Sequence, residues 1–100
     1  MRSSIIAYFD GHDKAAEHYP GKILRVTAFG AYAPTPLKPL EECTRQLISE
    51  RSIPESGMIV DAGCGDGRIV ALMSNIGYDA YGLEGDRVLA QQGKKNIEAL

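Results

Sequence analysis

The stretch that decides the fold is residues 58–84, MIVDAGCGDGRIVALMSNIGYDAYGLE. It opens with a short apolar run, Met58–Ala62, of the kind found in strands buried on both faces of a parallel sheet. A glycine-rich segment follows, and Gly77 is then placed to end a helix in a left-handed cap. The apolar face of that helix would comprise Ile69, Leu72, Met73 and Ile76. Residues 79–84 have the composition of a second strand.

A further helix is predicted beyond Glu84. Asp86 can cap its start, and its apolar face would include Leu89, Ile97 and Leu100. Alternating strands and helices with short connections are typical of parallel strands joined by right-handed crossovers. We therefore expect an α/β layer architecture from residue 58 onward.

The segment before this unit combines a linker and a helix. Prolines at positions 34, 36 and 39 predict an extended linker over residues 33–39. An amphipathic helix is predicted next, over residues 40–51, and Pro54 would end it. Its apolar face would comprise Leu40, Cys43, Leu47 and Ile48.

The N-terminal residues allow more than one interpretation. Residues 4–9 are apolar and aromatic enough for a strand, Asp10–Gly11 is a turn signal, and residues 22–29 alternate loosely enough for another strand. Residues 11–21 would form a loop or a short helix. The segment as a whole would be a hairpin or an irregular cap. We divide the chain into an N-terminal extension with its proline-rich loop, residues 1–36, and an α/β part, residues 37–100.

Composition restricts the class of protein. With 100 residues, 44% hydrophobic and 24% charged, the chain has room for one globular domain or part of one. A net charge of -2 gives no broad basic surface for nucleic acid. No run approaches the roughly 20 apolar residues of a membrane-spanning helix, and the first apolar run is too short for a signal peptide. We expect a cytoplasmic protein in which Cys43 and Cys64 are free thiols.

Gly63, Gly65 and Gly67 lie where the first predicted strand turns into a helix. Residues without side chains allow a tight bend and let a ligand lie directly against the main chain. Dinucleotide-binding loops have the pattern G-x-G-x-x-G, whereas this loop is G-x-G-x-G. Asp61 and Asp66 flank it, where they would repel a pyrophosphate. S-adenosylmethionine has no phosphate and carries an ammonium and a sulfonium, so these carboxylates would favour it.

Glu84 supplies a second signal. It ends the second predicted strand, 21 residues after Gly63, where an acidic side chain can accept hydrogen bonds from both hydroxyls of a ribose. The alternative is a glycine-rich turn with an incidental acidic residue at a strand end. Because strand, loop, helix and second strand follow in the required order, the sequence favours a nucleoside site.

On these residues the sequence resembles the class I S-adenosylmethionine-dependent methyltransferases. Residues 60–67 match the family's first motif, hydrophobic-acidic-hydrophobic-Gly-x-Gly-x-Gly, and residues 81–84 match its second. The resemblance implies a Rossmann-like doubly wound α/β fold, here incomplete, with its first two strands and their helices behind an N-terminal extension. It also implies that Asp61 orients the methionine end of the cofactor, that Glu84 holds its ribose, and that Gly85, Asp86 and Arg87 lie beside the adenosine.

A narrower resemblance involves the proline-rich segment. Tyr32-Ala33-Pro34-Thr35-Pro36, a helix and then the first motif are similar to the archaeal protein-lysine methyltransferases and the lysine methyltransferases of the ATP synthase c-subunit. In that family a Tyr-x-Pro-Thr-Pro segment folds over the methionine end of the cofactor. The full set of residues expected to bind S-adenosylmethionine is Tyr32, Thr35, Asp61, Gly63, Cys64, Gly65, Gly67, Glu84, Gly85 and Asp86.

Plainer interpretations exist for several of these residues. The proline-rich segment can be a simple loop in which Thr35 caps a helix beginning at Pro36. His12 and His18 match no common metal-ligand spacing, so we expect a solvated loop and no metal site there. Cys64 is expected to fill the loop and not to act as a nucleophile, because no histidine accompanies it in sequence.

The resemblance implies transfer of a methyl group to an acceptor, with protein lysine as the expected partner. A small molecule or an RNA base as acceptor, a cofactor-binding module without catalysis, and half of an NAD-dependent oxidoreductase are the alternatives. No catalytic residue is predicted. Residues 96–100 carry no helix stop signal, so we expect the chain to be a fragment of a longer enzyme, inactive alone, that exposes an apolar strand edge and self-associates.

Overall fold

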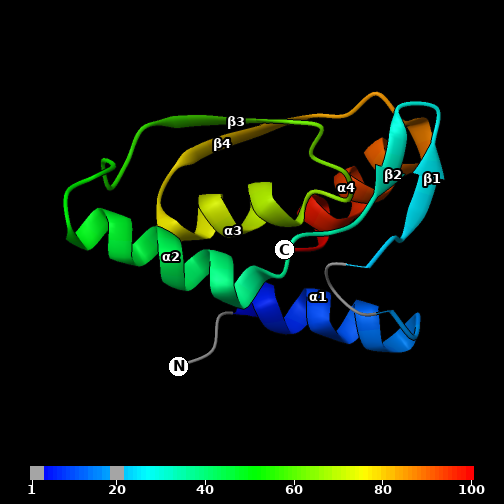
Figure 1. Cartoon of the computed structure of the whole chain (residues 1–100), viewed down its shortest axis with the longest axis horizontal. Coiled ribbons are helices and arrows are strands. Elements are labelled where there is room, and N and C mark those ends of the chain that lie inside the picture. The colour runs from blue at the N-terminus through cyan, green and yellow to red at the C-terminus, as the bar shows by residue number, and fades with distance from the viewer. Residues whose placement is uncertain (1–3, 19–21) are drawn as a thin grey trace.

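The computed structural model describes residues 4–18 and 22–100. Figure 1 shows the β3–β4 sheet above a layer of helices, with a separate hairpin, β1–β2, at one end. This confirms a small α/β arrangement of helices and short sheets. The elements are α1 (Ser4–Ala15), β1 (Arg25–Thr27), β2 (Gly30–Tyr32), α2 (Leu37–Ser49), β3 (Met58–Ala62), α3 (Arg68–Ile76), β4 (Asp79–Leu83) and α4 (Arg87–Ala99).

The strand, helix and strand predicted from residues 58–84 are confirmed. β3 and β4 pair in parallel, with a register that runs from Met58 opposite Asp79 to Ala62 opposite Leu83. Gly77 ends α3 with a φ of 133°, a backbone angle that residues with a side chain rarely adopt. The parallel pairing brings the chain segments that follow β3 and β4 to the same edge of the sheet.

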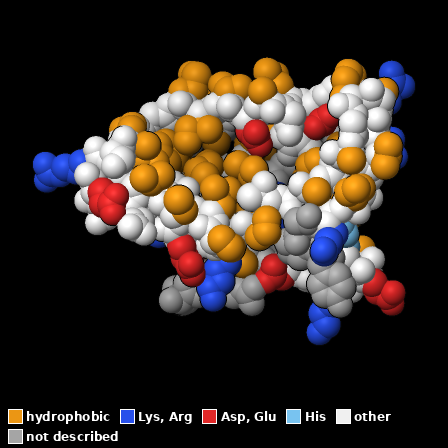
Figure 2. Space-filling view, viewed as in Figure 1, with side chains coloured by type: hydrophobic (Ala, Val, Ile, Leu, Met, Phe, Trp, Pro, Cys, Tyr) orange, Lys and Arg blue, Asp and Glu red, His pale blue; other side chains and the backbone are white. Residues whose placement is uncertain are grey.

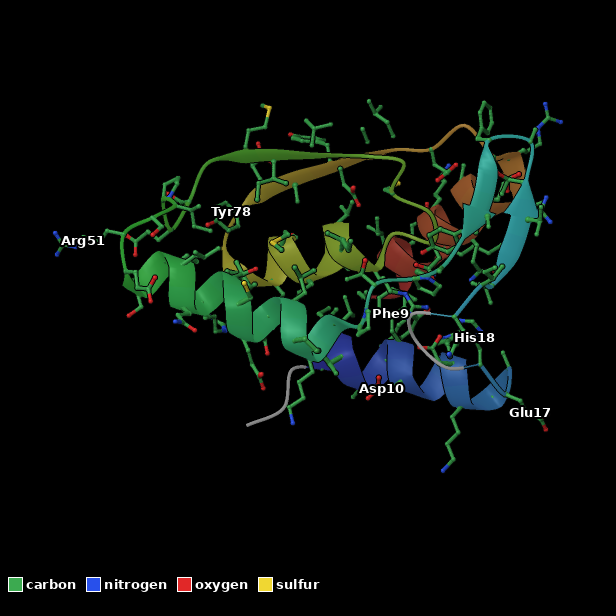
Figure 3. All side chains as sticks on the ribbon, in the orientation of Figure 1. Phe9, Asp10, Glu17, His18, Arg51 and Tyr78 are labelled. Atoms are coloured by element: carbon green, nitrogen blue, oxygen red, sulfur yellow. The ribbon has the colours of Figure 1, made fainter. Side chains whose placement is uncertain are left out.

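The strand predicted for residues 4–9 is wrong, and so is the turn at Asp10–Gly11. Both belong to α1, whose buried residues recur at helical spacing, namely Ile5, Ile6, Phe9 and Asp13. The apolar run of residues 4–9 was too short to distinguish the periodicity of a helix from that of a strand, and Gly11 made a helix look less favourable. Gly11 is tolerated because it faces open space on the outer side of the helix. Figure 3 shows Phe9 pointing from α1 toward the interior.

The hairpin also differs from the prediction. β1 covers Arg25–Thr27 instead of residues 22–29, and it pairs with β2 in antiparallel fashion instead of with residues 4–9. Of the loop or short helix predicted for residues 11–21, residues 11–15 are helical, and residues 19–21 lie outside the described residues.

The second helix begins earlier than predicted, at Leu37, with Pro39 in its first turn. A proline is accommodated there because the first N–H groups of a helix have no partner within it. Pro36 is the N-cap and no side chain caps the helix, so the predicted cap by Thr35 is wrong. Cys43, predicted on the apolar face, is exposed, and Thr44 is buried instead, donating its hydroxyl to the Leu40 carbonyl at 2.8 Å. Both cysteines are free, as predicted.

The core lies where three helices meet. Its buried residues come from α1, α2 and α3 and comprise Ile5, Ile6, Phe9, Leu37, Ala71 and Leu72. The N-terminal segment therefore shares one core with the α/β part. Within the described part of the chain, no helix combines the length and the apolar character needed to cross a membrane.

The β3–β4 sheet is covered on one face. α2 and α3 lie beneath it (Figure 1), whereas Met58, Val60, Tyr81 and Leu83 are exposed. Hydrophobic side chains accordingly gather along the upper edge of the molecule, over these strands (Figure 2). The prediction that residues 58–62 are buried on both faces is therefore wrong for the described structure. On α4, Leu89 is buried as predicted, but Gly93 and Asn96 are the other buried positions, and Ile97 and Leu100 are exposed.

Candidate functional site

The segment from Gly63 to Gly67, here called the glycine loop, carries the chain from β3 into α3. Its three glycines have φ angles of 82°, 55° and 82°, all in the region that favours glycine. The N–H groups of Gly63 and Cys64 both donate to the Leu83 carbonyl, at 2.7 and 2.9 Å. The loop is thus joined directly to the end of β4.

Glu84 lies against this loop. Its Oε1 accepts a hydrogen bond from the Gly65 N–H at 2.8 Å, and its Oε2 accepts one from the Asp86 N–H at 2.8 Å. The two motifs identified in the sequence therefore meet in space. An ionised carboxylate offers about four lone-pair sites, so two bonds to the main chain leave capacity for ligand hydroxyls.

A second carboxylate, Asp61, sits close to Glu84. Partial burial and the charge of Glu84 raise the pKa of Asp61 above its usual range. Burial, Asp61 and Glu84 likewise raise the pKa of the Cys64 thiol. A raised pKa keeps the Cys64 thiol protonated and therefore weakly nucleophilic. A positively charged ligand would relieve the repulsion between the two carboxylates, and an anion would add to it.

A pocket of about 290 Å³ opens beside the glycine loop. Tyr32 at the end of β2 and Thr35 in the proline-rich segment line it together with Asp61 at the end of β3 and with Gly63 and Cys64 of the glycine loop. A Cβ on Gly63 would have no atom within 4 Å, so the main chain there is open. The pocket is also lined by Ala31, Ala33, Arg68 and Ile69.

The other predicted site glycines are covered by protein atoms. A Cβ on Gly65 would lie 2.1 Å from the Tyr32 ring, so that ring occupies the space above the loop. A Cβ on Gly67 would lie 3.3 Å from Gly93 on α4. A Cβ on Gly85 would lie 2.9 Å from the ring of Phe29. These glycines permit close packing, whereas Gly63 faces open space.

Asp86 has two local partners. As predicted, it caps α4, accepting a hydrogen bond from the Leu89 N–H at 2.9 Å. Its carboxylate also accepts hydrogen bonds from Arg25 Nε at 2.9 Å and Nη2 at 3.3 Å. The hydrogen bond from Arg25, together with that from Leu89, lowers the pKa of Asp86. The pair ties the hairpin to the segment that follows β4.

Sequence reasoning missed a buried charged cluster behind the loop. Arg68, at the start of α3, is 3% exposed and forms paired hydrogen bonds with Asp13 of α1, both at 2.9 Å. It also donates to Asp66, with Nη2–Oδ2 at 2.7 Å. Tyr32 completes the cluster by donating its hydroxyl to Asp66 Oδ1 at 2.9 Å. Burial alone would lower the pKa of Arg68, but the hydrogen bonds with Asp13 and Asp66 raise it overall.

The α4 helix supports the same loop. Asn96 donates its side-chain amide to the Asp66 carbonyl at 2.9 Å and accepts a hydrogen bond from the Tyr8 hydroxyl at 3.0 Å. Burial and the neighbouring Asp66 raise the pKa of Tyr32, which keeps its hydroxyl a donor. α1, α4 and the end of β2 thus all hold the rear of the glycine loop in place.

One signal could have revealed this cluster. Asp13 follows Phe9 by one helical turn, so a helical assignment of residues 4–15 would have placed an acid on an apolar face and demanded a cationic partner. Nothing in the spacing of Tyr8 and Asn96 could have linked them, because they are far apart in sequence.

His12 lies within α1 and His18 lies just after it. The His12 ring lies 4.4 Å from the Tyr8 ring. Across residues 4–18 and 22–100 no group of three or more histidine, cysteine or acidic side chains could hold a metal ion.

The chain matches no protein-family model, no curated protein and no solved structure.

Proposed function

We propose that this chain forms the S-adenosylmethionine-binding part of a class I methyltransferase domain and that the enzyme methylates protein lysine. In this proposal β3 and β4 belong to a larger, Rossmann-like doubly wound sheet. The observation that carries it is the contact between Glu84 and the glycine loop, 2.8 Å from Gly65 N to Glu84 Oε1. A glycine loop after one parallel strand and an acid after the next form a site for a nucleoside.

The residues around the loop fit the chemistry of this cofactor. Glu84 has acceptor capacity left for the ribose hydroxyls. Asp61 and its raised pKa favour a ligand that brings positive charge, here the ammonium and sulfonium of the methionine end. Gly63 leaves open main chain beside the pocket that Tyr32 and Thr35 line. A pyrophosphate would instead place negative charge beside two carboxylates.

The cofactor, when bound, supplies the methyl group and its own leaving group. The contribution of this chain is to orient that cofactor and to exclude water around it. Tyr32 would help to orient the cofactor from a fixed position, because its hydroxyl donates a hydrogen bond to Asp66. A lysine acceptor must be neutral when it attacks, which a desolvated channel favours by lowering its pKa. We assign no residue of this chain to that deprotonation.

The likeness of residues 32–36 to a Tyr-x-Pro-Thr-Pro segment favours protein lysine over other acceptors. The position of Tyr32 and Thr35 beside the glycine loop supports this, because a segment that folds over the methionine end must lie there. A small-molecule or RNA acceptor would use the same cofactor residues.

Isothermal calorimetry tests the proposal. The wild-type chain is titrated with S-adenosylhomocysteine and with NAD, and Glu84→Gln and Asp79→Asn are compared. Asp79 is the matched control, because it is an acid at the opposite end of β4. We expect S-adenosylhomocysteine to bind, Glu84→Gln to weaken it at least tenfold, and Asp79→Asn to leave it unchanged. Binding of NAD alone, or equal effects of the two variants, would contradict the proposal.

A further inference from the structure

A large aromatic side chain stands exposed beside the segment that follows Glu84. Phe29 is 77% exposed, at the tip of the β1–β2 hairpin. The turn that carries it is fixed by Thr27, whose Oγ1 accepts a hydrogen bond from the Phe29 N–H at 3.0 Å and donates to the Gly30 carbonyl at 2.9 Å. The main chain that carries Phe29 is therefore fixed, while the ring itself is exposed.

The position of this ring depends on Gly85. A Cβ on Gly85 would lie 2.9 Å from Cε2 and 3.0 Å from Cζ of Phe29. Only a glycine allows so close an approach between the ring and the main chain next to Glu84. One edge of the ring rests on Gly85, and the rest of it faces solvent.

The hairpin is also anchored at both ends of the candidate site. Arg25 on β1 forms the two-bond ion pair with Asp86. Ala31 and Tyr32 on β2 line the pocket beside Asp61 and Gly63. The same hairpin thus extends from the pocket to the segment after β4.

We propose that Phe29 forms one wall of a subsite for the nucleoside base and stacks on the adenine of a ligand whose ribose is held by Glu84. This inference rests on the proposed function. Aromatic side chains bind bases through their faces, because each base is a flat π-system that loses its water on stacking. A stacking wall makes no hydrogen bond to the base, so Phe29 would set affinity for a base without choosing among purines.

The test compares two exposed residues of the same hairpin. Val26, on β1, is 74% exposed and is the matched control for Phe29. Wild type, Phe29→Ala and Val26→Ala are titrated by calorimetry with S-adenosylhomocysteine and with adenosine, and their thermal unfolding is recorded. We expect Phe29→Ala to weaken both ligands about tenfold with little change in Tm, and Val26→Ala to change neither.

A second variant reports on the contact itself. The chain has no tryptophan, so Phe29→Trp introduces a single tryptophan at the proposed wall, which can be excited selectively over the tyrosines. We expect this variant to retain binding and its emission to be quenched by adenosine. Asp61→Asn separates the two ends of the ligand, because it should weaken S-adenosylhomocysteine and leave adenosine unchanged.

The outcomes distinguish the two proposals. If wild type binds S-adenosylhomocysteine but Phe29→Ala binds it equally well, the base subsite is overturned and the proposed function stands. If the Phe29→Trp emission does not respond to a bound ligand, the base subsite is likewise overturned. If wild type does not bind S-adenosylhomocysteine, both proposals fall.

Discussion

The two sides of the glycine loop, its rear toward α1 and α4 and its front toward Asp61 and Glu84, differ in whether their charged side chains are paired. Behind the loop, Arg68 neutralises Asp13 and Asp66 in a buried cluster that Tyr32 and Asn96 extend. At the front, partial burial and the charge of Glu84 raise the pKa of Asp61, and no cation is paired with either carboxylate among the described residues. The rear is complete as it stands, whereas the front gains from a positively charged ligand.

This difference separates stability from binding. A buried charge cluster with every partner present holds its elements in one arrangement, and removing one member leaves uncompensated charges behind. Two neighbouring carboxylates do the opposite, because their repulsion costs stability until something binds. We therefore expect changes at the rear to unfold the chain and changes at the front to alter its affinity for ligand.

The largest effect is expected at Arg68. Arg68→Met keeps most of the side-chain volume but leaves Asp13 and Asp66 buried without their cation, and it should lower the free energy of unfolding by about 3–5 kcal/mol. Urea unfolding followed by circular dichroism measures this. Arg45→Ala is the control, because its exposed ion pair with Glu41, at 3.4 Å, should contribute less than about 1 kcal/mol. Equal unfolding midpoints for the two variants would show that the rear cluster does not stabilise the fold.

Two glycine-to-alanine changes in helices should have opposite effects on the free energy of unfolding. A Cβ on Gly93 would lie 3.1 Å from the Gly65 carbonyl oxygen, and main-chain atoms of the loop cannot yield easily. Gly93→Ala should therefore destabilise the chain by about 1–2 kcal/mol despite the better helix propensity of alanine. Gly11→Ala meets no atom within 4 Å and should stabilise α1 by about 0.5–1 kcal/mol. The Tm of both variants measures these effects. A higher Tm for Gly93→Ala than for wild type would contradict the close packing of α4 on the loop.

The role of Asp61 at the front of the loop can be tested by the pH dependence of stability and of ligand binding. A raised folded pKa means that the contribution of Asp61 to stability is most favourable below its unfolded pKa of about 3.9 and is lost as pH rises through the folded pKa. At pH 7, Asp61→Asn should thus slightly stabilise the free chain while weakening S-adenosylmethionine about tenfold. Unfolding and binding measured at pH 4 and pH 7 would reveal this opposition. A variant that loses both stability and affinity at pH 7 would place Asp61 with the rear cluster.

The smallest effect on stability is expected on the open face of the sheet. Val60→Thr and Leu83→Thr change exposed side chains, so each should alter the free energy of unfolding by less than about 0.5 kcal/mol. If this face causes self-association, the double variant should sediment as a smaller species than wild type at the same concentration. An unchanged sedimentation coefficient would remove the sheet face as the cause.

The sequence was most informative where local patterns decide structure. The apolar run, the alternating glycines and the acid after the next strand predicted β3, α3 and β4 and the meeting of Glu84 with the glycine loop. These elements follow one another along the chain and need no distant partner to be recognised. Asp86 as the cap of α4 is another local signal that the structure confirms.

Prediction failed where distant contacts decide. Residues 4–9 fit a strand by composition, and only packing of Phe9 and its neighbours against α2 and α3 makes them helical. The sequence indicated no role for Arg68, whose burial depends on the contact with Asp13 of α1. Phe29 carried no signal, because its place beside Gly85 results from a hairpin that the sequence did not define.

We expect ligand to bind at the front of the glycine loop, in the pocket that Tyr32 and Arg68 also line, and to leave Asp13 and α4 at the rear unchanged. Amide chemical shifts of the nitrogen-15-labelled chain, followed by NMR during titration with S-adenosylhomocysteine, test it most directly. We predict the largest shifts at Gly63, Gly65, Glu84 and Asp86, with Asp13 and Gly93 nearly unmoved. Absence of any shift, or shifts confined to the open face of the β3–β4 sheet, would show that ligand does not bind at the front of the glycine loop.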